Sequence, residues 1–308
     1  LGDAYLAELG KILRRQFVFA SDSEITLEAN PDDITLAKLR RFRDLGINRL
    51  SLGAQSFDEA ELRFLGRRHT VSQTMAAIDL IRNAGFTNLG LDLIYGLPGQ
   101  TAAAWRRNLE TALSFNPEHL SCYQLTLADE TPMGQWAAQG DLVPLDEDSQ
   151  REFFLLTASF LQEKGYLHYE VANFARGEEY LCRHNRKYWT RVPYLGLGPA
   201  AHSFDGSRRW WNVSSVKHYY ASLNAGRAPV AGQETLTPAQ MRLETFYLGF
   251  RTREGVSLAA IRDCPRGEAI LAELEEAGLV RVENDRVRAT VQGLVVADGL
   301  PLWFGDES

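Results

Sequence analysis

The 308-residue sequence has few cysteines, and their placement excludes two classes of protein. The three residues, Cys122, Cys182 and Cys264, are widely separated. An odd, scattered set is not a disulfide framework, and no pair has the CxxC-like spacing of a metal chelate. Because disulfide-rich proteins belong to oxidising compartments, the sequence favours a reducing, cytoplasmic setting.

Long hydrophobic runs and an excess of positive charge are also missing. No stretch approaches the ~18 uninterrupted apolar residues of a membrane-spanning helix. No basic, apolar leader opens the chain, so no secretory signal is expected. The net charge of −7 disfavours a protein built to neutralise nucleic-acid phosphates. With 45% hydrophobic and 24% charged residues, the composition is that of a globular protein with a sizeable core.

Short apolar runs alternate with amphipathic helices through the first 128 residues. Strands that alternate with helices pair in parallel through right-handed crossovers. The pattern predicts an α/β fold, either a TIM-like barrel or part of one. A doubly wound sheet is the alternative, although no GxGxxG motif follows the first run. The runs are 24–31, 49–56, 88–98 and 119–127, and the helices are expected at 35–45, 71–84 and 101–115.

The alternation ends after residue 130. A long amphipathic helix is expected at 148–165, an aromatic and Gly-rich stretch follows, and helices return from residue 236. Residues 270–289 have the pattern helix, strand, turn and strand, which is typical of a small winged helix. Winged helices often bind DNA, but residues 236–308 carry eight Arg, no Lys and twelve Asp/Glu. This balance favours a structural or protein-contacting role.

Unusual polar residues lie where the strands are expected to end. Glu28 closes the first run, Gln55 the second, and Asp92 interrupts the very apolar third run. In parallel barrels, ligands gather at the carboxyl ends of strands. Asp92 would suit a ribose diol, Glu28 an ammonium group, and Arg67 a carboxylate. Together these preferences describe an amino acid joined to a nucleoside, although each residue alone could equally be a core polar residue bonded to a neighbouring loop.

Residues 183–211 are basic and aromatic in an otherwise acidic chain. They hold six Arg/Lys against a single Asp, and three of the six tryptophans. A flat, dianionic porphyrin would suit such a segment through aromatic faces, Arg or Lys at its propionates and His at its iron. Tryptophans that cover a barrel mouth, a solvated basic face, or a small nucleic-acid patch would give the same composition.

Five motifs of the first part of the chain carry a family resemblance. They are LEANP (27–31), NRLSLGAQSF (48–57), LGRRH (65–69), LDLIYGLPGQT (91–101) and HLSCYQLT (119–126). These motifs resemble the radical S-adenosylmethionine proteins related to oxygen-independent coproporphyrinogen III oxidase. Within that group, CRHNRKYW (182–189) followed by YLGLGPAAHSF (194–204) is similar to the HemW-type haem chaperone branch. The resemblance runs over nearly the whole chain.

The resemblance implies an α/β fold: a partial (β/α)6 TIM-like barrel with a C-terminal α/β accessory region that contains the winged-helix-like unit. Three parts are expected. They are a truncated radical S-adenosylmethionine barrel core at 1–130, barrel completion with the porphyrin- or haem-binding region at 131–235, and the winged-helix-like domain at 236–308.

The resemblance also assigns a site for S-adenosylmethionine. Glu28 would hold the amino group and Arg67 the carboxylate. Gln55 and Asp92 would bind the ribose hydroxyls, and Ile94 would pack on the adenine. This assignment agrees with the preferences of the polar residues at the strand ends.

A haem site is implied in the HNxxYW segment. His184 would be the axial ligand of the iron, with His202 as the second candidate. Asn185, Tyr188 and Trp189 would shape the site rather than bind the metal. Taken alone, His184 could equally be a hydrogen-bonded core histidine.

The sequence departs from the family at the cluster motif. The family carries CxxxCxxC near its N-terminus, and the three thiolates hold a [4Fe–4S] cluster. None of the three cysteines lies in such a motif, and a GGGTP-like loop is missing as well. The resemblance therefore implies that the first two βα units lie upstream of Leu1, so that only the full-length protein binds the cluster.

Three functions stay open. The first is a haem chaperone that binds haem and S-adenosylmethionine and delivers haem to a membrane-associated acceptor protein. The second is oxygen-independent oxidative decarboxylation of coproporphyrinogen III to protoporphyrinogen IX, and the third is a catalytically inert barrel that serves as a binding module. The HNxxYW motif favours the first, while the question whether the chain is an enzyme stays open. No nucleic-acid partner is expected, and the oligomeric state stays open, with a homodimer as one candidate.

Overall fold

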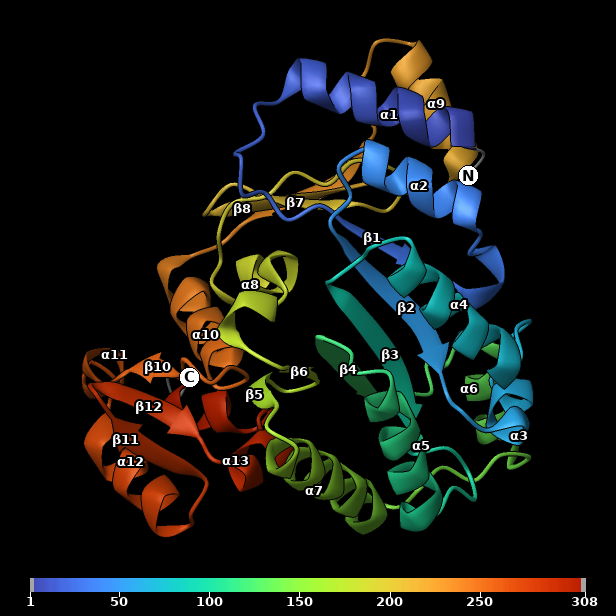
Figure 1. Ribbon diagram of the computed structural model, residues 1–308. Helices are drawn as coiled ribbons and strands as arrows, with labels where there is room; N and C mark the ends of the chain where they lie inside the picture. Colours follow the sequence, from blue (N-terminus) through green and yellow to red (C-terminus); the bar gives the residue numbers. More distant parts are fainter. Residues whose placement is uncertain (1–2, 306–308) are drawn as a thin grey trace. The chain divides into compact units, whose positions relative to one another are not determined.

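The chain folds as two units, residues 1–182 and 183–308, in a computed structural model that describes residues 3–305 (Figure 1). Each unit has a hydrophobic core of its own. The division into three parts, at residues 130 and 235, stays a prediction. Within the described part of the chain, no helix is both long enough and apolar enough to cross a membrane.

A six-stranded sheet forms the centre of the first unit, in the order β1-β2-β3-β4-β6-β5. The first four strands pair in parallel, which confirms the expected α/β fold with parallel strands. The last two strands form an antiparallel hairpin that also pairs antiparallel to β4. The strands are β1 (Thr26–Ala29), β2 (Arg49–Gln55), β3 (Leu89–Tyr95), β4 (His119–Gln124), β5 (Leu167–Glu170) and β6 (Asn173–Ala175).

Helices connect the parallel strands, and threonines begin several of them. Thr35, Thr70 and Thr101 each accept a backbone N–H hydrogen bond at the start of the helix that follows, as expected of N-caps. The helices are α1 (Asp3–Gln16), η1 (Pro31–Asp33), α2 (Leu36–Asp44), α3 (Glu59–Phe64), α4 (Val71–Asn83), α5 (Ala102–Ser114), α6 (Pro132–Gln139), α7 (Glu147–Glu163) and η2 (Glu178–Tyr180).

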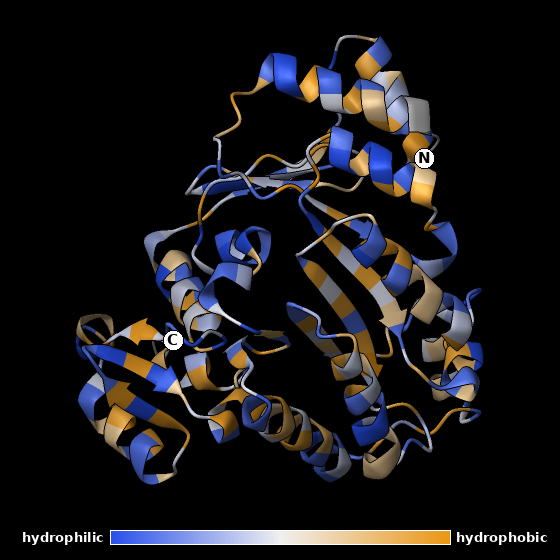
Figure 2. Cartoon of the chain, in the orientation of Figure 1, coloured by the Kyte–Doolittle hydropathy of each residue, from blue (hydrophilic) through white to orange (hydrophobic). Residues whose placement is uncertain are grey.

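The core of the first unit lies between the sheet and these helices. Leu50 and Leu52 of β2 and Leu91 of β3 are fully buried, together with Trp105 of α5. Hydrophobic colours follow β2 and β3, while the helices beside them show both polar and apolar residues (Figure 2). Because side chains alternate along a strand, the residues between these leucines point to the opposite face of the sheet.

The second unit begins with a helix and an antiparallel sheet. The sheet has the order β7-β8-β9, and Gly232 of β9 lies so close to Trp211 of β8 that a Cβ there would meet the indole ring at 2.5 Å. Its elements are α8 (Arg183–Trp189), β7 (His202–Phe204), β8 (Arg208–Asn212), α9 (Val216–Asn224) and β9 (Val230–Thr235).

The rest of the second unit confirms the winged-helix-like arrangement. Three helices precede the hairpin of a small antiparallel sheet in the order β10-β12-β11. Phe246, Phe250 and Phe304 pack in its core. The elements are α10 (Pro238–Gly249), β10 (Val256–Ser257), α11 (Leu258–Arg262), α12 (Gly267–Glu276), β11 (Val280–Glu283), β12 (Arg286–Ala289), α13 (Val291–Val295) and η3 (Leu300–Phe304).

Candidate functional site

The sheet face opposite the helices is lined by polar residues in successive rows. The strand register places Glu28 opposite Ser51, and Ser51 opposite Gly90. In the next row, Asp92 of β3 lies opposite Ser121 of β4. Since paired residues project to the same side of a sheet, three neighbouring strands bring the predicted Glu28 and Asp92 to one face. We call this the inner face.

Gln55 ends β2 in a backbone conformation that is uncommon for any residue other than glycine. Its φ is 65°, in the left-handed region, and the register with β3 shifts between Leu52 and Gln55. A Cβ at Gly53 would lie 2.7 Å from Nε2 of Gln55 and 3.6 Å from Oδ1 of Asn30. The shift re-aims the side chain, as bulges near functional sites do, and Gly53 leaves room for it.

Two serines hold the Asp92 carboxylate. Oγ of Ser51 lies 3.2 and 3.3 Å from its two oxygens. Burial raises the pKa of Asp92, hydrogen bonds from Ser121 and Ser51 lower it, nearby Glu28 raises it, and Arg49 lowers it. A carboxylate has about four acceptor positions, so an ionised Asp92 can accept further hydrogen bonds from a pair of hydroxyls.

Arg67 and Ile94 complete the predicted set. Nε of Arg67 is buried and finds no hydrogen-bond partner within residues 3–305. A buried guanidinium N–H that lacks a protein partner suits an acceptor supplied by a ligand, such as a carboxylate. Ile94 is half-buried on β3, two positions beyond Asp92 and therefore on the same face. It is paired with Tyr123 of β4. The unpaired Nε of Arg67 suits a carboxylate, and the space above Gly53 beside the Gln55 amide suits a polar group of a ligand. Both features fit a ligand that joins an amino acid to a nucleoside.

Sequence reasoning missed the residues that support this set. It did not single out Ser51, Ser121, Arg49 or Gly90, all of which lie on the inner face beside or below Asp92. A signal was present: from Arg49 onward, every second residue of β2 is polar or glycine, while the residues between are apolar. That period marks a strand with one polar face.

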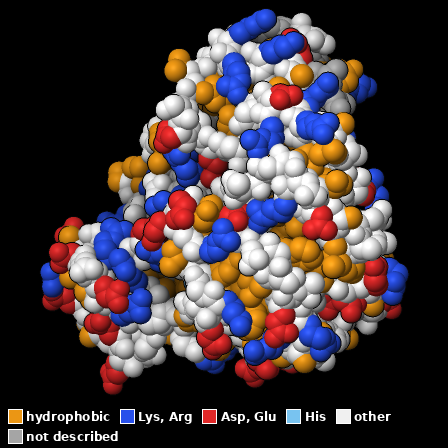
Figure 3. All heavy atoms as spheres, viewed as in Figure 1, with side chains coloured by type: hydrophobic (Ala, Val, Ile, Leu, Met, Phe, Trp, Pro, Cys, Tyr) orange, Lys and Arg blue, Asp and Glu red, His pale blue; other side chains and the backbone are white. Residues whose placement is uncertain are grey.

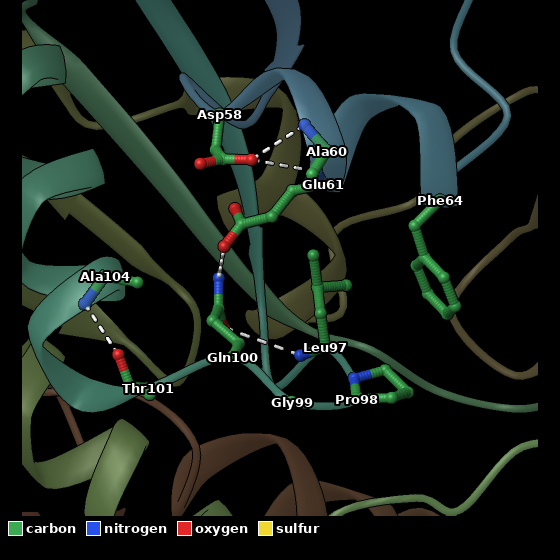
Figure 4. Close-up of a pocket in the computed structure, with 10 residues that line it drawn as sticks. All are labelled: Asp58, Ala60, Glu61, Phe64, Leu97, Pro98, Gly99, Gln100, Thr101 and Ala104. Atoms are coloured by element: carbon green, nitrogen blue, oxygen red, sulfur yellow. Dashed lines mark hydrogen bonds between the residues drawn. The ribbon is translucent and has the colours of Figure 1, made fainter.

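Hydrogen bonds of the Gln100 side chain fix the loop after β3. Oε1 of Gln100 accepts from N of Gly96 at 2.8 Å, and its Nε2 donates to Oε1 of Glu61 at 2.9 Å. Glu61 also accepts hydrogen bonds from Ser56 and from Asn108. These bonds join the GLPGQT motif to α3 and α5, so the motif has a structural role in this fold (Figure 4).

A cavity of about 300 Å³ adjoins this loop. Figure 4 shows Asp58 and Thr101 turned toward the starts of α3 and α5, where each accepts backbone N–H hydrogen bonds. The side chains of Asp58 and Thr101 at the edge of the cavity are therefore already engaged in hydrogen bonds within the protein. The cavity is lined by Asp58, Ala60, Glu61, Phe64, Leu97, Pro98, Gly99, Gln100, Thr101 and Ala104.

The HNxxYW residues all lie on α8. His184 and Tyr188 are exposed and one helical turn apart, and the Tyr188 hydroxyl is 3.1 Å from Nε2 of His184. Their rings meet edge to face at 5.1 Å, and Tyr188 continues the contact to Tyr194 at 4.7 Å. Asn185 and Trp189 are half-buried on the next face. An exposed imidazole set among aromatic rings can approach a flat, metal-bearing ligand.

The second histidine candidate has different surroundings. His202 is exposed on β7, and its ring stacks on Trp211 with the ring centres 5.9 Å apart. His184 belongs to α8 and His202 to the first strand of the β7-β8-β9 sheet. The two candidates therefore stand on separate elements.

Most basic side chains of the 183–211 segment have acidic partners. Arg186 pairs with Glu254, and Arg191 and Arg209 both pair with Glu244. These partners come from residues beyond the segment, so the local excess of positive charge is largely neutralised on folding. Acidic and basic side chains are also mixed over the face of the molecule seen in Figure 3.

The cysteines do not form a cluster site. Cys122, Cys182 and Cys264 are all buried, and none is in a disulfide. Burial raises the pKa of the Cys122 thiol, and nearby Asp92 raises it further. Across residues 3–305, no three His, Cys, Asp or Glu side chains are grouped so that they could hold a metal ion. The described residues therefore do not fit a [4Fe–4S] cluster.

Comparisons with known proteins decide the family. The Radical SAM superfamily model matches residues 2–112, and the HemN C-terminal domain model matches residues 236–296. A Mycobacterium tuberculosis protein named "Heme chaperone HemW" is 35% identical over 303 residues, which cover 97% of this chain and 76% of that protein. This chain belongs to the HemW family of radical SAM proteins.

Other members of the HemW family and a solved structure agree. The Bacillus subtilis "Heme chaperone HemW" is 32% identical over 307 residues, which cover 97% of this chain and 80% of that protein. The structure titled "Coproporphyrinogen III oxidase (HemN) from Escherichia coli is a Radical SAM enzyme" matches with a TM-score of 0.80 at 24% identity, over 100% of this chain and 75% of that one. It confirms the fold. The family assignment made from the motifs is confirmed as well.

Proposed function

We propose that this protein is a haem chaperone, which binds haem and S-adenosylmethionine and delivers the haem to an acceptor protein. The observation that carries the proposal is the 35% identity to a protein named as a heme chaperone over 97% of this chain. The oxidase alternative rests on a likeness of fold at 24% identity, which carries no argument about activity.

In this proposal, the inner face of the first unit binds S-adenosylmethionine. Glu28 holds its amino group and the orphaned guanidinium nitrogen of Arg67 its carboxylate. Gln55 and Asp92 accept hydrogen bonds from the ribose hydroxyls, and Ile94 packs on the adenine. Members of the radical SAM superfamily use S-adenosylmethionine together with a [4Fe–4S] cluster as a source of radicals. The ligands of that cluster are not among residues 3–305.

Haem is the cargo and binds the second unit at α8. Nitrogen ligands from histidine are common at haem iron, and the exposed His184 offers one among aromatic rings that can face the porphyrin. Tyr188 donates or accepts one hydrogen bond at Nε2 of His184 and orients the imidazole. Membrane-associated haem proteins are the acceptors that we propose.

Titration with haem, followed by Soret absorbance, tests this proposal. We expect His184→Ala to weaken haem binding by about tenfold or more, which is ~1.4 kcal/mol, and to shift the Soret maximum. His202→Ala tests the second candidate in the same way, because His202 is also exposed and beside an aromatic ring. An unchanged affinity and spectrum for His184→Ala would remove His184 as the ligand, and a loss for His202→Ala would then assign that role to His202.

Product analysis separates the chaperone from the oxidase. The natural gene product is purified anaerobically, its cluster is reconstituted, and it is incubated with coproporphyrinogen III, S-adenosylmethionine and a reductant. The proposal expects no protoporphyrinogen IX, and haem transfer to an apo-acceptor in a parallel assay. Formation of protoporphyrinogen IX would replace the chaperone by the oxidase.

A further inference from the structure

A buried arginine lies beneath the carboxylate of the inner face. Arg49 is the first residue of β2 and only 3% exposed. Its Nε finds no hydrogen-bond partner within residues 3–305. Burying a cation is costly unless the charge interacts favourably with its surroundings. The position of Arg49 therefore calls for a compensating interaction.

The guanidinium of Arg49 reaches the centre of the inner face because Gly90 lies there. A Cβ at Gly90 would lie 3.2 Å from Nη2 of Arg49, 3.2 Å from Oγ of Ser51 and 3.4 Å from Nδ1 of His119. These three polar atoms converge on the place that a side chain of residue 90 would take. Asp92 is the next residue of β3 on the same face, and Ser51 is already hydrogen-bonded to it.

The neighbours of Asp92 show which of them can favour its charged form. Glu28 of β1 raises the pKa of Asp92, whereas Arg49 of β2 lowers it, against the larger rise that burial causes. From β4, Tyr123 projects to the same face as Asp92, whereas Cys122 pairs with Leu93 and projects to the opposite face. Both have a pKa raised by burial and by Asp92 itself. Among the charged neighbours that shift the pKa of Asp92, Arg49 is the cation, and it is the one that favours the ionised carboxylate.

The histidine beside Arg49 does not compete for this role. Burial lowers the pKa of His119 well below its usual value, and the charge of Arg49 lowers it further. Nε2 of His119 is bonded to the hydroxyl of Tyr169 at 2.7 Å. A neutral imidazole can face a guanidinium without repulsion, so Arg49 supplies the positive charge at this place.

We propose that Arg49 is a positioning residue of the S-adenosylmethionine site: its guanidinium, which lies against Gly90 on the inner face, favours the carboxylate form of Asp92, the form that accepts hydrogen bonds from the ribose hydroxyls. This inference rests on the proposed function of Asp92 and names the residue that sustains it. It also explains why residue 90 is a glycine inside a strand, where glycine otherwise weakens the structure.

Titration of Asp92 in the ligand-free protein tests the inference directly. Protein labelled with 13C at the aspartate carboxyl carbon is followed by NMR from acid to neutral pH, and the Asp92 signal is identified by its loss in Asp92→Asn. We expect Arg49→Gln to move the midpoint of Asp92 to higher pH and Arg49→Lys to restore most of the wild-type value. An unchanged midpoint in folded Arg49→Gln would overturn the inference.

Two further variants guard against misfolding and simple charge effects. Gly90→Ala keeps every charge, but its Cβ would lie 3.2 Å from both Nη2 of Arg49 and Oγ of Ser51. Both atoms must then shift by a few tenths of an ångström away from it, so the midpoint should rise by less than in Arg49→Gln. Arg106→Gln removes the same charge from an exposed position on α5 and should leave the midpoint unchanged. If Arg106→Gln raises the midpoint as far as Arg49→Gln does, the effect is one of net charge alone and the inference is wrong.

Calorimetric titration with S-adenosylmethionine at several pH values gives the second readout. At pH values between the two NMR midpoints, Arg49→Gln should weaken binding by about tenfold, and by less above both midpoints, where Asp92 is ionised in both proteins. If Asp92→Asn binds as tightly as the wild type, the proposed function of Asp92 fails. The NMR midpoint still reports on Arg49 in that case, so the two failures are distinguishable.

Discussion

Glu170 is a carboxylic acid whose protonation belongs to the folded state. It is 1% exposed on β5, accepts a hydrogen bond from Asn173, and takes another from the backbone N of Ala172 at 3.3 Å. Burial raises its pKa to about 7, and the two hydrogen bonds lower it only in part. The folded protein therefore binds a proton here at pH values where the unfolded chain has lost it.

This linkage predicts a loss of stability with rising pH. Between the unfolded pKa near 4.5 and the folded pKa of about 7, the folded state binds more protons, so the free energy of unfolding falls as pH rises. The contribution is about 3 kcal/mol across that window. Glu170→Gln stays neutral, so urea unfolding at pH 5 and pH 8 should show this loss in the wild type and little of it in the variant. Parallel pH profiles for the two proteins would contradict the assignment.

At the scale of elements, the loop between β3 and α5 owes its shape to one amide. Replacing Gln100 by Ala removes its bonds to Gly96 and to Glu61. Because partly buried groups lose their partners, we expect the free energy of unfolding to fall by ~2 kcal/mol. The neighbouring Thr101→Ala is the matched control: it removes the N-cap of α5 and should cost about 1 kcal/mol. Urea unfolding measures both losses. Equal losses of unfolding free energy in the two variants would show that Gln100 stabilises the fold no more than a single helix N-cap does.

The parallel strands were predictable from sequence, but beyond them only a strand-like piece at 168–174 was expected, not the antiparallel hairpin that β5 and β6 form. Runs such as 88–98 are long and apolar, and each is followed by a capped helix, so both the strand and its parallel pairing can be inferred. β5 and β6 have only four and three residues, too few for a periodic signal. The bend at Gln55 also escaped prediction, because its left-handed backbone depends on Gly53 and the neighbouring strand rather than on a turn motif.

The residues of the candidate sites likewise fall into those that the sequence indicated and those that it did not. Glu28, Asp92 and His184 could be proposed from the sequence because a charged or metal-binding side chain stands in a recognisable motif. Arg49 and Ser51 went unnoticed, since their roles arise from the register that sets them beside Asp92. The pairing of Arg191 and Arg209 with Glu244 was hidden for a related reason: Glu244 lies more than thirty residues further along the chain.

At the scale of the whole molecule, two separate cores predict two unfolding transitions. Leu109 is fully buried in the core of residues 1–182, and Phe250 is fully buried in the core of the winged-helix-like region. Truncating either to Ala removes buried apolar volume and should cost roughly 3 kcal/mol within its own unit. Since each unit has more than a hundred residues, that loss corresponds to roughly 10 °C in the Tm of the affected transition.

Differential scanning calorimetry of the two variants distinguishes independent from joint unfolding. Leu109→Ala should lower one transition and Phe250→Ala the other, while the remaining transition of each variant stays within about 2 °C of the wild type. A single transition lowered by both variants would show that the units unfold together. Separate transitions would mean that haem binding at α8 protects only the second unit, because a ligand stabilises the cooperative unit that binds it. Adding haem should then raise the transition that Phe250→Ala lowers, and leave the transition that Leu109→Ala lowers unchanged.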